Sequence, residues 1–208
     1  MNPFDDPALA ARYEDWYSGP GSRADALEKE LLRKLLIPSV KTILEVGSGT
    51  GHFTRWFRDI GLFAVGIDPS AAMLAEASRR NGVTYIKADA VSLPFADRTF
   101  DGVAIVTTLE FVSDPLQVLK EACRVARQEL LLGVLNRHSI LTWRLRRSGK
   151  PLWKAAHFFT PSELTRLVRS SLGERIKSVV WRTTLGTFGC NCVFPWGGFI
   201  GMAVQIHE

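Results

Sequence analysis

The sequence predicts an α/β fold in which helices cover both faces of a doubly wound, mostly parallel sheet of seven strands. Short apolar runs alternate with helical patterns along most of the 208 residues, as repeated βα units require. A glycine-rich turn follows the first apolar run, at residues 47–51. Two strand-like segments near the C-terminus, 175–184 and 199–206, have no helical pattern between them. They predict a C-terminal antiparallel hairpin.

Length and composition are those of one globular domain, residues 1–208. Hydrophobic residues make up 46% and charged residues 23% of the chain, and this length supports one full-sized core. No apolar run approaches the roughly 20 residues of a membrane span, and the polar, acidic start argues against a signal peptide. Three cysteines, an odd number, disfavour a disulfide framework. We therefore expect a cytoplasmic protein without a membrane partner. Its net charge of +5 could indicate an anionic partner, although a modest excess is more often ordinary solubility charge.

Residues 1–37 are expected to form an N-terminal arm and a helix. Prolines and glycines punctuate residues 1–21, which indicates a loose arm with a short helix. Apolar residues at helical spacing then predict a helix over 23–36, with Ser22 as its cap. The arm also contains an aromatic cluster: Tyr13, Trp16 and Tyr17.

The turn at residues 47–51 joins a buried strand, 43–46, to a helix. Such a junction brings backbone N–H groups and the positive end of a helix dipole to one point, where a ligand can approach the main chain. The spacing Gly47-x-Gly49-x-Gly51 differs from the G-x-G-x-x-G of dinucleotide-binding folds, and no P-loop pattern is present. Taken alone, the turn also fits a purely geometric role.

An acidic residue follows the second apolar strand. Asp68 comes directly after the run 62–67 and 23 residues after Glu45 (68 minus 45). That separation is close to the roughly 20-residue offset of a carboxylate that binds ribose hydroxyls. A carboxylate suits the task because it accepts hydrogen bonds from two neighbouring hydroxyl groups. Asp68 could instead cap the helix over 71–79, although Ser70 could fill that role.

The next two strands also end in polar residues. A third strand over 83–90 ends in Asp89 and Ala90, where Asp89 could simply be a solvent-facing turn residue. A fourth strand over 99–106 is followed by residues 107–111. Because ligands in open α/β sheets bind beyond the carboxyl ends of the strands, residues 107–111 are candidates to line a pocket.

The run Leu44-Glu45-Val46-Gly47-Ser48-Gly49-Thr50-Gly51 resembles the first motif of the class I S-adenosylmethionine-dependent methyltransferases of the small single-domain type. In that family an acidic residue precedes a G-x-G-x-G turn. The loop Leu93-Pro94-Phe95, the Phe100-Asp101 strand and the helix with Glu121-x-x-Arg124-Val125 also resemble family patterns. The family's Lys-Pro-Gly-Gly turn after that helix is replaced by Ala126-Arg127-Gln128-Glu129.

The resemblance implies a Rossmann-like fold, S-adenosylmethionine as cofactor and S-adenosylhomocysteine as product, with no metal. It implies that Asp68 binds the ribose and that Asp89 and Ala90 meet the adenine. The aromatic residues of the arm would fold over the cofactor, or else only pack the arm to the body. The cofactor-binding residues expected on this basis are Glu45, Gly47, Ser48, Gly49, Gly51, Asp68, Pro69, Asp89, Ala90, Thr107, Tyr13 and Trp16.

Residues 137–159 are expected to cover the acceptor pocket. The segment is rich in basic and aromatic residues and has few acids. It could bind nucleic acid or an acidic small molecule, or be a solvated helix face with aromatic residues packed beneath it.

Methyl transfer by direct SN2 attack depends on alignment of the reactants more than on a catalytic dyad. No catalytic residue is therefore assigned, although Glu110, His138 and His157 could remove a proton from an acceptor. We expect a methyltransferase that acts on a small-molecule acceptor. One alternative is an RNA or protein methyltransferase that uses the basic segment 137–154, although a nucleic-acid partner is not favoured. Another is a non-catalytic cofactor- or partner-binding protein of the same fold.

Overall fold

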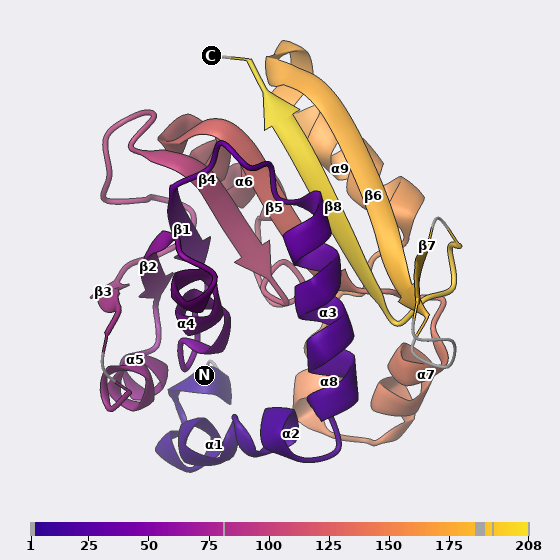
Figure 1. The fold of residues 1–208 in the computed structure, drawn as a ribbon. Coiled ribbons are helices and arrows are strands. Elements are labelled where there is room, and N and C mark those ends of the chain that lie inside the picture. The colour runs from indigo at the N-terminus through magenta and orange to yellow at the C-terminus, as the bar shows by residue number, and fades with distance from the viewer. Residues whose placement is uncertain (1–2, 81, 186–189, 193, 208) are drawn as a thin grey trace.

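The computed structural model of the protein describes residues 3–80, 82–185, 190–192 and 194–207. Five strands pair in parallel: β1 (Thr42–Val46), β2 (Phe63–Asp68), β3 (Thr84–Lys87), β4 (Phe100–Val106) and β5 (Ala126–Leu135). Three pair antiparallel: β6 (Ile176–Leu185), β7 (Cys190–Cys192) and β8 (Phe199–Ile206). Their order in the sheet is β3-β2-β1-β4-β5-β8-β6-β7 (Figure 1). The predicted α/β architecture is confirmed, and the three-residue β7 lengthens the antiparallel edge.

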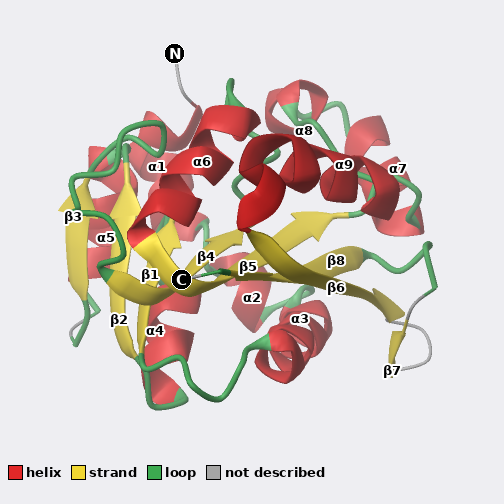
Figure 2. Cartoon of the chain, turned by 90° about the horizontal axis from the view of Figure 1, so that it is seen from above, coloured by secondary structure: helices red, strands yellow, loops and turns green. Residues whose placement is uncertain are grey.

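Helices cover both faces of this sheet (Figure 2). They are η1 (Pro3–Asp5), α1 (Pro7–Arg12), α2 (Asp15–Ser18), α3 (Ser22–Leu35), α4 (His52–Asp59), α5 (Ala71–Ser78), α6 (Pro115–Val125), α7 (Ile140–Arg147), α8 (Pro151–Ala155), α9 (Pro161–Leu172) and η2 (Gly173–Arg175). Helices α3 and α4 pack on one face, and α6 and α9 pack on the other. In β1 the side chains alternate between these two cores, Ile43 with the first and Leu44 with the second, as the two-residue period of a strand requires. Within the described ranges, none of these helices is long and apolar enough to cross a bilayer.

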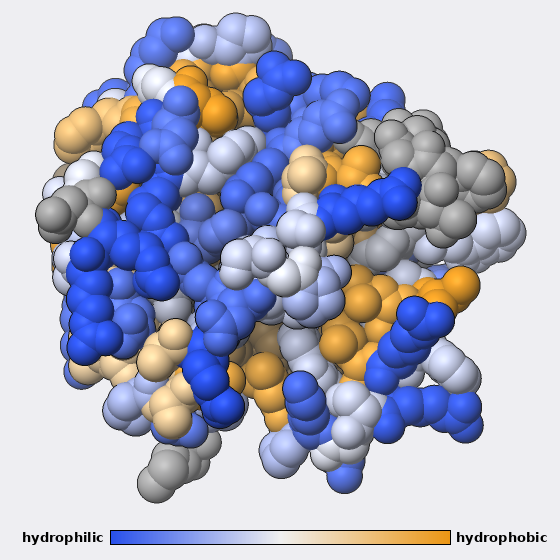
Figure 3. All heavy atoms as spheres, turned by 60° about the horizontal axis from the view of Figure 1, so that its bottom comes forward, coloured by the Kyte–Doolittle hydropathy of each residue, from blue (hydrophilic) through white to orange (hydrophobic). Residues whose placement is uncertain are grey.

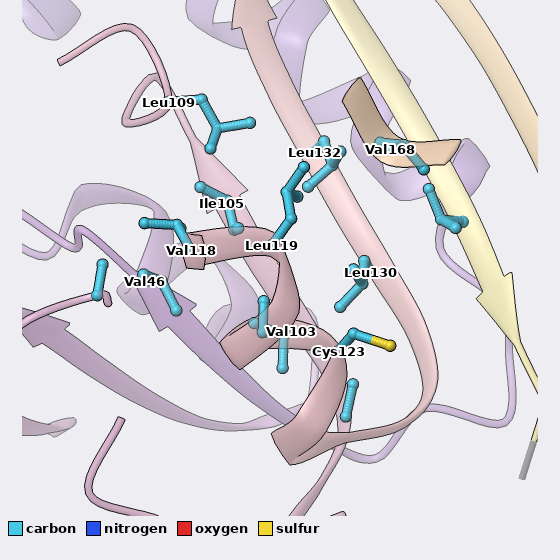
Figure 4. Packing of buried hydrophobic residues seen from close by; sticks show 14 of the residues in the cluster. Val46, Val103, Ile105, Leu109, Val118, Leu119, Cys123, Leu130, Leu132 and Val168 are labelled. Carbon is cyan, nitrogen blue, oxygen red and sulfur yellow. The ribbon is translucent and has the colours of Figure 1, made fainter. Parts of the chain in front are cut away.

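The larger core lies between α6 and α9 and the centre of the sheet. Leu119 and Cys123 on α6 point toward Val103 on β4 and Leu130 on β5 (Figure 4). Cys123 is a free, buried thiol and behaves as a small apolar residue. The side chains of Cys190 and Cys192 lie outside the described part of the chain.

Helix boundaries differ from the sequence prediction at two places. Ser22 does not cap α3; it is the first residue of that helix, and Gly21 occupies the cap position without a side-chain bond. At the end of α6, Ala126 is both the helix C-cap and the first residue of β5, so the helix passes into the strand without the turn that related sequences carry. Helix α9 begins with a capping box, in which Thr160 and Glu163 bond reciprocally.

Arg124 on α6 anchors the loop between β3 and β4. Its guanidinium donates to Glu121 at 2.8 Å, to Asp97 at 2.9 Å and to the carbonyl oxygens of Leu93 and Phe95 at 3.0 and 2.8 Å. The Glu121 carboxylate in turn accepts from the Leu93 N–H at 2.8 Å. The ion pair of Arg124 with Glu121 is therefore the centre of a network that fixes this loop.

We expect the substitution Arg124→Met to lower the free energy of unfolding by about 2–3 kcal/mol, because it removes the donor of several hydrogen bonds and leaves Glu121 without its cation. Urea unfolding measures the loss. Arg127→Met is the matched control, because the Arg127 side chain is half-exposed and its ion pair with Asp101 is longer, at 3.3 Å. The control variant should lose less than about 0.5 kcal/mol of unfolding free energy. Equal losses in the two variants would contradict the anchoring role.

Candidate active site

A cavity of about 180 Å³ lies at the carboxyl ends of β1, β2 and β4. Its walls come from the glycine turn after β1, the end of β2, the loop after β3, residues 106–112 and the N-terminal arm. Open α/β sheets bind ligands at this position. Most of the residues expected at the cofactor site line it: Glu45, Gly47, Ser48, Gly49, Asp68, Pro69, Asp89, Ala90, Thr107 and Tyr13.

Two of the expected residues, Gly51 and Trp16, lie outside the lining. Gly51 has a φ of 79° and occupies the N-cap position of α4. A Cβ there would collide with the hydroxyl of Tyr85, so glycine is required for backbone geometry and packing. Trp16 lies over Gly21 and contacts Tyr17 edge-to-face, with ring centroids 5.0 Å apart. For Trp16 the geometry matches the alternative in which it packs the arm together.

The N–H groups of the glycine turn are partly engaged within the protein. Gly47 and Ser48 both donate to the Ile67 carbonyl oxygen at 2.8 Å, and Gly49 donates to the Asp68 carboxylate at 2.9 Å. These bonds tie the turn after β1 to the end of β2. These three N–H groups are therefore already engaged. A ligand would contact the turn mainly where its glycines have no side chain.

Close approach is possible at Gly49, and two buried hydroxyl groups lie beside it. Gly49 has a φ of 52°, and a Cβ placed on it would meet no atom within 4 Å. Ser48 Oγ and Thr50 Oγ1 belong to lining residues, are buried and have no hydrogen-bond partner in the described part of the chain. Buried polar atoms without partners are rare in native proteins. This part of the cavity therefore fits a ligand with polar groups of its own.

Asp68 ends β2 and is buried in the cavity wall. Its Oδ1 accepts from the Ser70 N–H at 2.8 Å and its Oδ2 from the Gly49 N–H at 2.9 Å. Each carboxylate oxygen can accept one further bond, so both remain available to a pair of hydroxyl groups. Burial raises the pKa of Asp68. The helix cap falls to Ser70, whose Oγ accepts from the Met73 N–H at 3.2 Å.

Glu45 and Asp89 contribute to the lining in different ways. Glu45 is buried in β1 and accepts a hydrogen bond from the Thr54 hydroxyl. Asp89 is exposed in the loop after β3, where its Oδ1 accepts from the Val91 N–H at 3.1 Å. The third strand ends at Lys87, earlier than the sequence predicts, so Asp89 lies in a loop and not at the last position of a strand.

Thr107 adopts a backbone conformation that is uncommon outside glycine, with a φ of 47°. Its N–H donates to the Gly133 carbonyl oxygen at 2.7 Å. The neighbouring Thr108 hydroxyl donates to the carbonyl oxygens of Gly47 at 3.2 Å and Val106 at 3.0 Å. Strained residues persist where the surroundings over-determine them, and they cluster at functional sites. The end of β4 is thereby fixed beside the glycine turn.

The N-terminal arm forms the outer wall of the cavity. Tyr17 stacks on His52 with ring centroids 3.7 Å apart and an interplanar angle of 11°. Phe4 meets Phe111 edge-to-face at 5.1 Å. Burial, followed by the charge of Glu110, raises the pKa of Tyr13 to about 12, so this phenol stays protonated at neutral pH. The cavity is thus enclosed by aromatic side chains on the side opposite the sheet.

Several lining residues were missed by the sequence reasoning: Phe4, Thr50, His52, Phe53, Met73 and Val112 among them. Tyr17, which belongs to the arm's aromatic cluster, also lines the cavity. The available signal for His52 was its place at the helix start. Of residues 107–111, which the sequence analysis expects at a pocket, Thr107, Thr108 and Phe111 line the cavity. Leu109 is instead buried in the core, and Glu110 is turned away. Its Oε1 accepts from the Leu135 N–H at 2.6 Å.

Comparison with known proteins agrees with this geometry. Residues 44–132 match the methyltransferase domain family. An S-adenosylmethionine-dependent methyltransferase of Thermotoga maritima, described as a possible histamine N-methyltransferase, superposes with a TM-score of 0.81 at 27% identity, covering 96% of this chain and 97% of that one. Residues 44–132 are thus a methyltransferase domain, and the chain has the fold of class I S-adenosylmethionine-dependent methyltransferases.

Curated relatives match over part of their length. An uncharacterized protein of Mycobacterium tuberculosis is 35% identical over 78% of this chain and 57% of its own length. A demethylmenaquinone methyltransferase of Roseiflexus sp. is 33% identical over 65% of this chain and 56% of its own length. The chain therefore spans little more than half of these two relatives.

Four buried glutamates make the stability of the protein pH-dependent. Burial raises the pKa of Glu28 and Glu45 to about 8 and that of Glu110 and Glu129 to about 7. The folded state therefore keeps protons that the unfolded chain releases near its ordinary pKa of about 4.5. We expect the melting temperature to fall as the pH rises from about 5 to about 8, measured by thermal unfolding at fixed ionic strength.

The variant Glu28→Gln should reduce this decline, because it removes one of the titrating groups. Glu30→Gln is the control on the same helix, since a hydrogen bond from Lys34 lowers the pKa of Glu30 and the residue stays ionised throughout the range. A decline that is unchanged in Glu28→Gln would contradict the role assigned to that carboxyl group.

Proposed function

We propose that this protein transfers the methyl group of S-adenosylmethionine to a small-molecule acceptor. The observation that carries the proposal is the cavity in which the glycine turn, the Asp68 carboxylate and the loop after β3 face the same space. The two partnerless hydroxyl groups of Ser48 and Thr50 support a ligand with polar substituents there.

The residues present fit the cofactor. Asp68 would accept from the ribose hydroxyls, and Asp89 with Ala90 would meet the adenine. Ser48 and Thr50 would bond the polar amino-acid end. When bound, S-adenosylmethionine supplies an electrophilic methyl group on a sulfonium centre. The chain's own contribution is to orient the reactants and exclude water. The strained Thr107 and the aromatic wall formed by the arm support this role.

A small acceptor is favoured by the walls of the cavity and by the relatives. Phe4, Phe111 and Tyr17 enclose the side of the cavity opposite the sheet, which suits a compact molecule. Trp153 on α8 lies 6.1 Å from Phe111, centroid to centroid, and this contact supports residues 137–159 as the cover of an acceptor pocket. Two relatives are described as a demethylmenaquinone methyltransferase and a possible histamine N-methyltransferase, and both descriptions denote small acceptors.

The test is a methyl-transfer assay on the purified protein with labelled S-adenosylmethionine, supplied separately with metabolite, RNA and protein fractions. We expect label to enter a metabolite and S-adenosylhomocysteine to form in equal amount. Label in RNA or protein would overturn the small-acceptor assignment. Calorimetric binding of S-adenosylmethionine without turnover on any fraction would favour a non-catalytic binding protein, and a lack of binding would refute the site itself.

A further inference from the structure

Helix α7 carries apolar side chains on its outer side as well as on its inner side. Leu141 and Leu145 pack against the core. On the opposite side, Ile140 is 72% exposed and Trp143 is 55% exposed. Residues three and four apart share one face of a helix, so Ile140, Trp143 and Arg147 form a single outward stripe. A helix that only closes a fold would carry polar residues there.

A loop beside α7 adds two more exposed aromatic residues. Phe194 and Trp196 contact each other with ring centroids 5.4 Å apart, and Trp196 is 60% exposed. The Asn136 side-chain amide donates to the carbonyl oxygens of Pro195 at 2.6 Å and Gly197 at 2.7 Å. These bonds fix the loop to the segment that leads into α7, so the aromatic residues of both belong to one surface.

The same surface is strongly cationic. No acidic residue occurs between Glu129 and Glu163 in the sequence. Within the described ranges, Arg144 and Arg147 are exposed and form no ion pair, and the Arg147 guanidinium lies 4.6 Å from the centroid of the Trp143 ring. On the side of the molecule that Figure 3 brings forward, hydrophobic and strongly hydrophilic side chains lie next to each other.

A neighbouring groove extends this charge. The groove measures about 740 Å³ and runs along α9 and β6, with Trp196 in its lining. Arg166 and Arg169 also line it, and both are exposed on the outer side of α9. Cations thus surround the exposed aromatic residues on two sides, and the charge of this region is complementary to an anionic partner.

We propose that this surface, formed by Ile140, Trp143, Arg144, Arg147, Phe194 and Trp196, docks on the headgroup region of an anionic lipid bilayer. Tryptophan and other amphipathic side chains favour the membrane–water interface. Arginines that lack acidic partners are attracted to anionic headgroups. Peripheral binding of this kind needs no spanning helix. Aromatic and basic residues also bind single-stranded RNA, but the exposed aliphatic side chain of Ile140 favours lipid.

This docking surface is separate from the cavity, and the proposal does not depend on the proposed methyl transfer. It departs from the sequence-based expectation of no membrane partner, which rested on the lack of a spanning segment. Four of its six residues lie on the segment 137–159, which contacts the cavity wall through Trp153 and Phe111. The cover of the cavity would therefore lie at the bilayer.

The test is co-sedimentation of the full chain with vesicles. One set contains phosphatidylcholine and phosphatidylglycerol in a three-to-one ratio, and the other contains phosphatidylcholine alone. We expect binding to the anionic vesicles at low salt, much weaker binding to the neutral ones, and loss of binding in half-molar sodium chloride. Absence of binding to anionic vesicles at low salt would overturn the proposal.

Two variants with matched controls locate the surface. Arg144→Gln with Arg147→Gln should weaken binding by roughly 25-fold, about five-fold for each cation. Arg33→Gln with Lys120→Gln, which changes exposed cations on α3 and α6, should weaken it far less. Trp143→Ala with Trp196→Ala should weaken binding at least about ten-fold. Phe63→Ala is the control for the aromatic residues, because Phe63 is 66% exposed at the amino end of β2.

Unchanged melting temperatures would show that the variants are folded. Brominated lipids should quench the tryptophan fluorescence of the wild type more strongly than that of the Trp143→Ala and Trp196→Ala double variant. Equal loss in a variant and its control would overturn the assignment of the surface. Binding of single-stranded RNA that is lost in the arginine variant, without vesicle binding, would overturn lipid as the partner.

Discussion

The substitution Asp68→Ala is expected to weaken S-adenosylmethionine binding by at least about 100-fold. Two hydroxyl groups of the ribose would lose a charged hydrogen-bond acceptor, and each such bond contributes about 1.5–3 kcal/mol to binding. A loss of about 1.4 kcal/mol in binding free energy lowers the affinity ten-fold. The Gly49 and Ser70 N–H groups, which donate to Asp68 at 2.9 and 2.8 Å, would also lose their partner. Calorimetric titration measures the affinity, and urea unfolding should show a stability loss of about 2 kcal/mol in a folded protein.

Asp114→Ala separates the two effects of that substitution. Asp114 caps α6 and accepts from the Gln117 N–H at 3.0 Å, outside the lining of the cavity. Its removal should lower stability by about 1 kcal/mol and leave the affinity for S-adenosylmethionine unchanged. If Asp68→Ala binds the cofactor as the wild type does, Asp68 is not a ribose ligand.

The substitution Gly49→Val is expected to reduce S-adenosylmethionine affinity by roughly 100-fold or more while the protein remains folded. A Cβ at Gly49 would meet no atom of the described residues within 4 Å, so a side chain there would enter the space in which a ligand approaches the main chain. The left-handed backbone, with a φ of 52°, adds about 1–2 kcal/mol of strain. Titration calorimetry and thermal unfolding together measure the two effects.

Gly61→Val is the matched control, since Gly61 also has a positive φ, 97°, and open space around it, but lies outside the lining of the cavity. It should lose a similar amount of stability and no affinity. Gly47 differs from both, because a Cβ there would collide with Thr108 and Gly47→Val should destabilise the fold itself. Parallel loss of affinity in the Gly49 and Gly61 variants would show that backbone strain, and not contact with a ligand, is responsible.

Local sequence patterns predicted the elements well. Apolar runs located the strands to within a few residues, because a buried parallel strand needs a continuous apolar segment. Thr160 and Glu163 form the capping box at the start of α9, and a local interaction of this kind can be recognised in the sequence. Ser22 misled the prediction for α3, because a serine before an apolar pattern resembles a cap whether or not the backbone turns at that residue.

The sequence by itself determined the α/β class, the glycine turn and the acidic end of β2, because each depends on neighbours within a few residues. The tertiary structure decided which side chains converge. It placed β8 between β5 and β6, brought Tyr13 and Phe4 to the cavity, and turned Trp16 and Glu110 away from it. It also engaged the Gly47 and Ser48 N–H groups with Ile67. These outcomes depend on contacts between segments far apart in the chain, and no local pattern encodes the direction in which a side chain at the end of a loop will point.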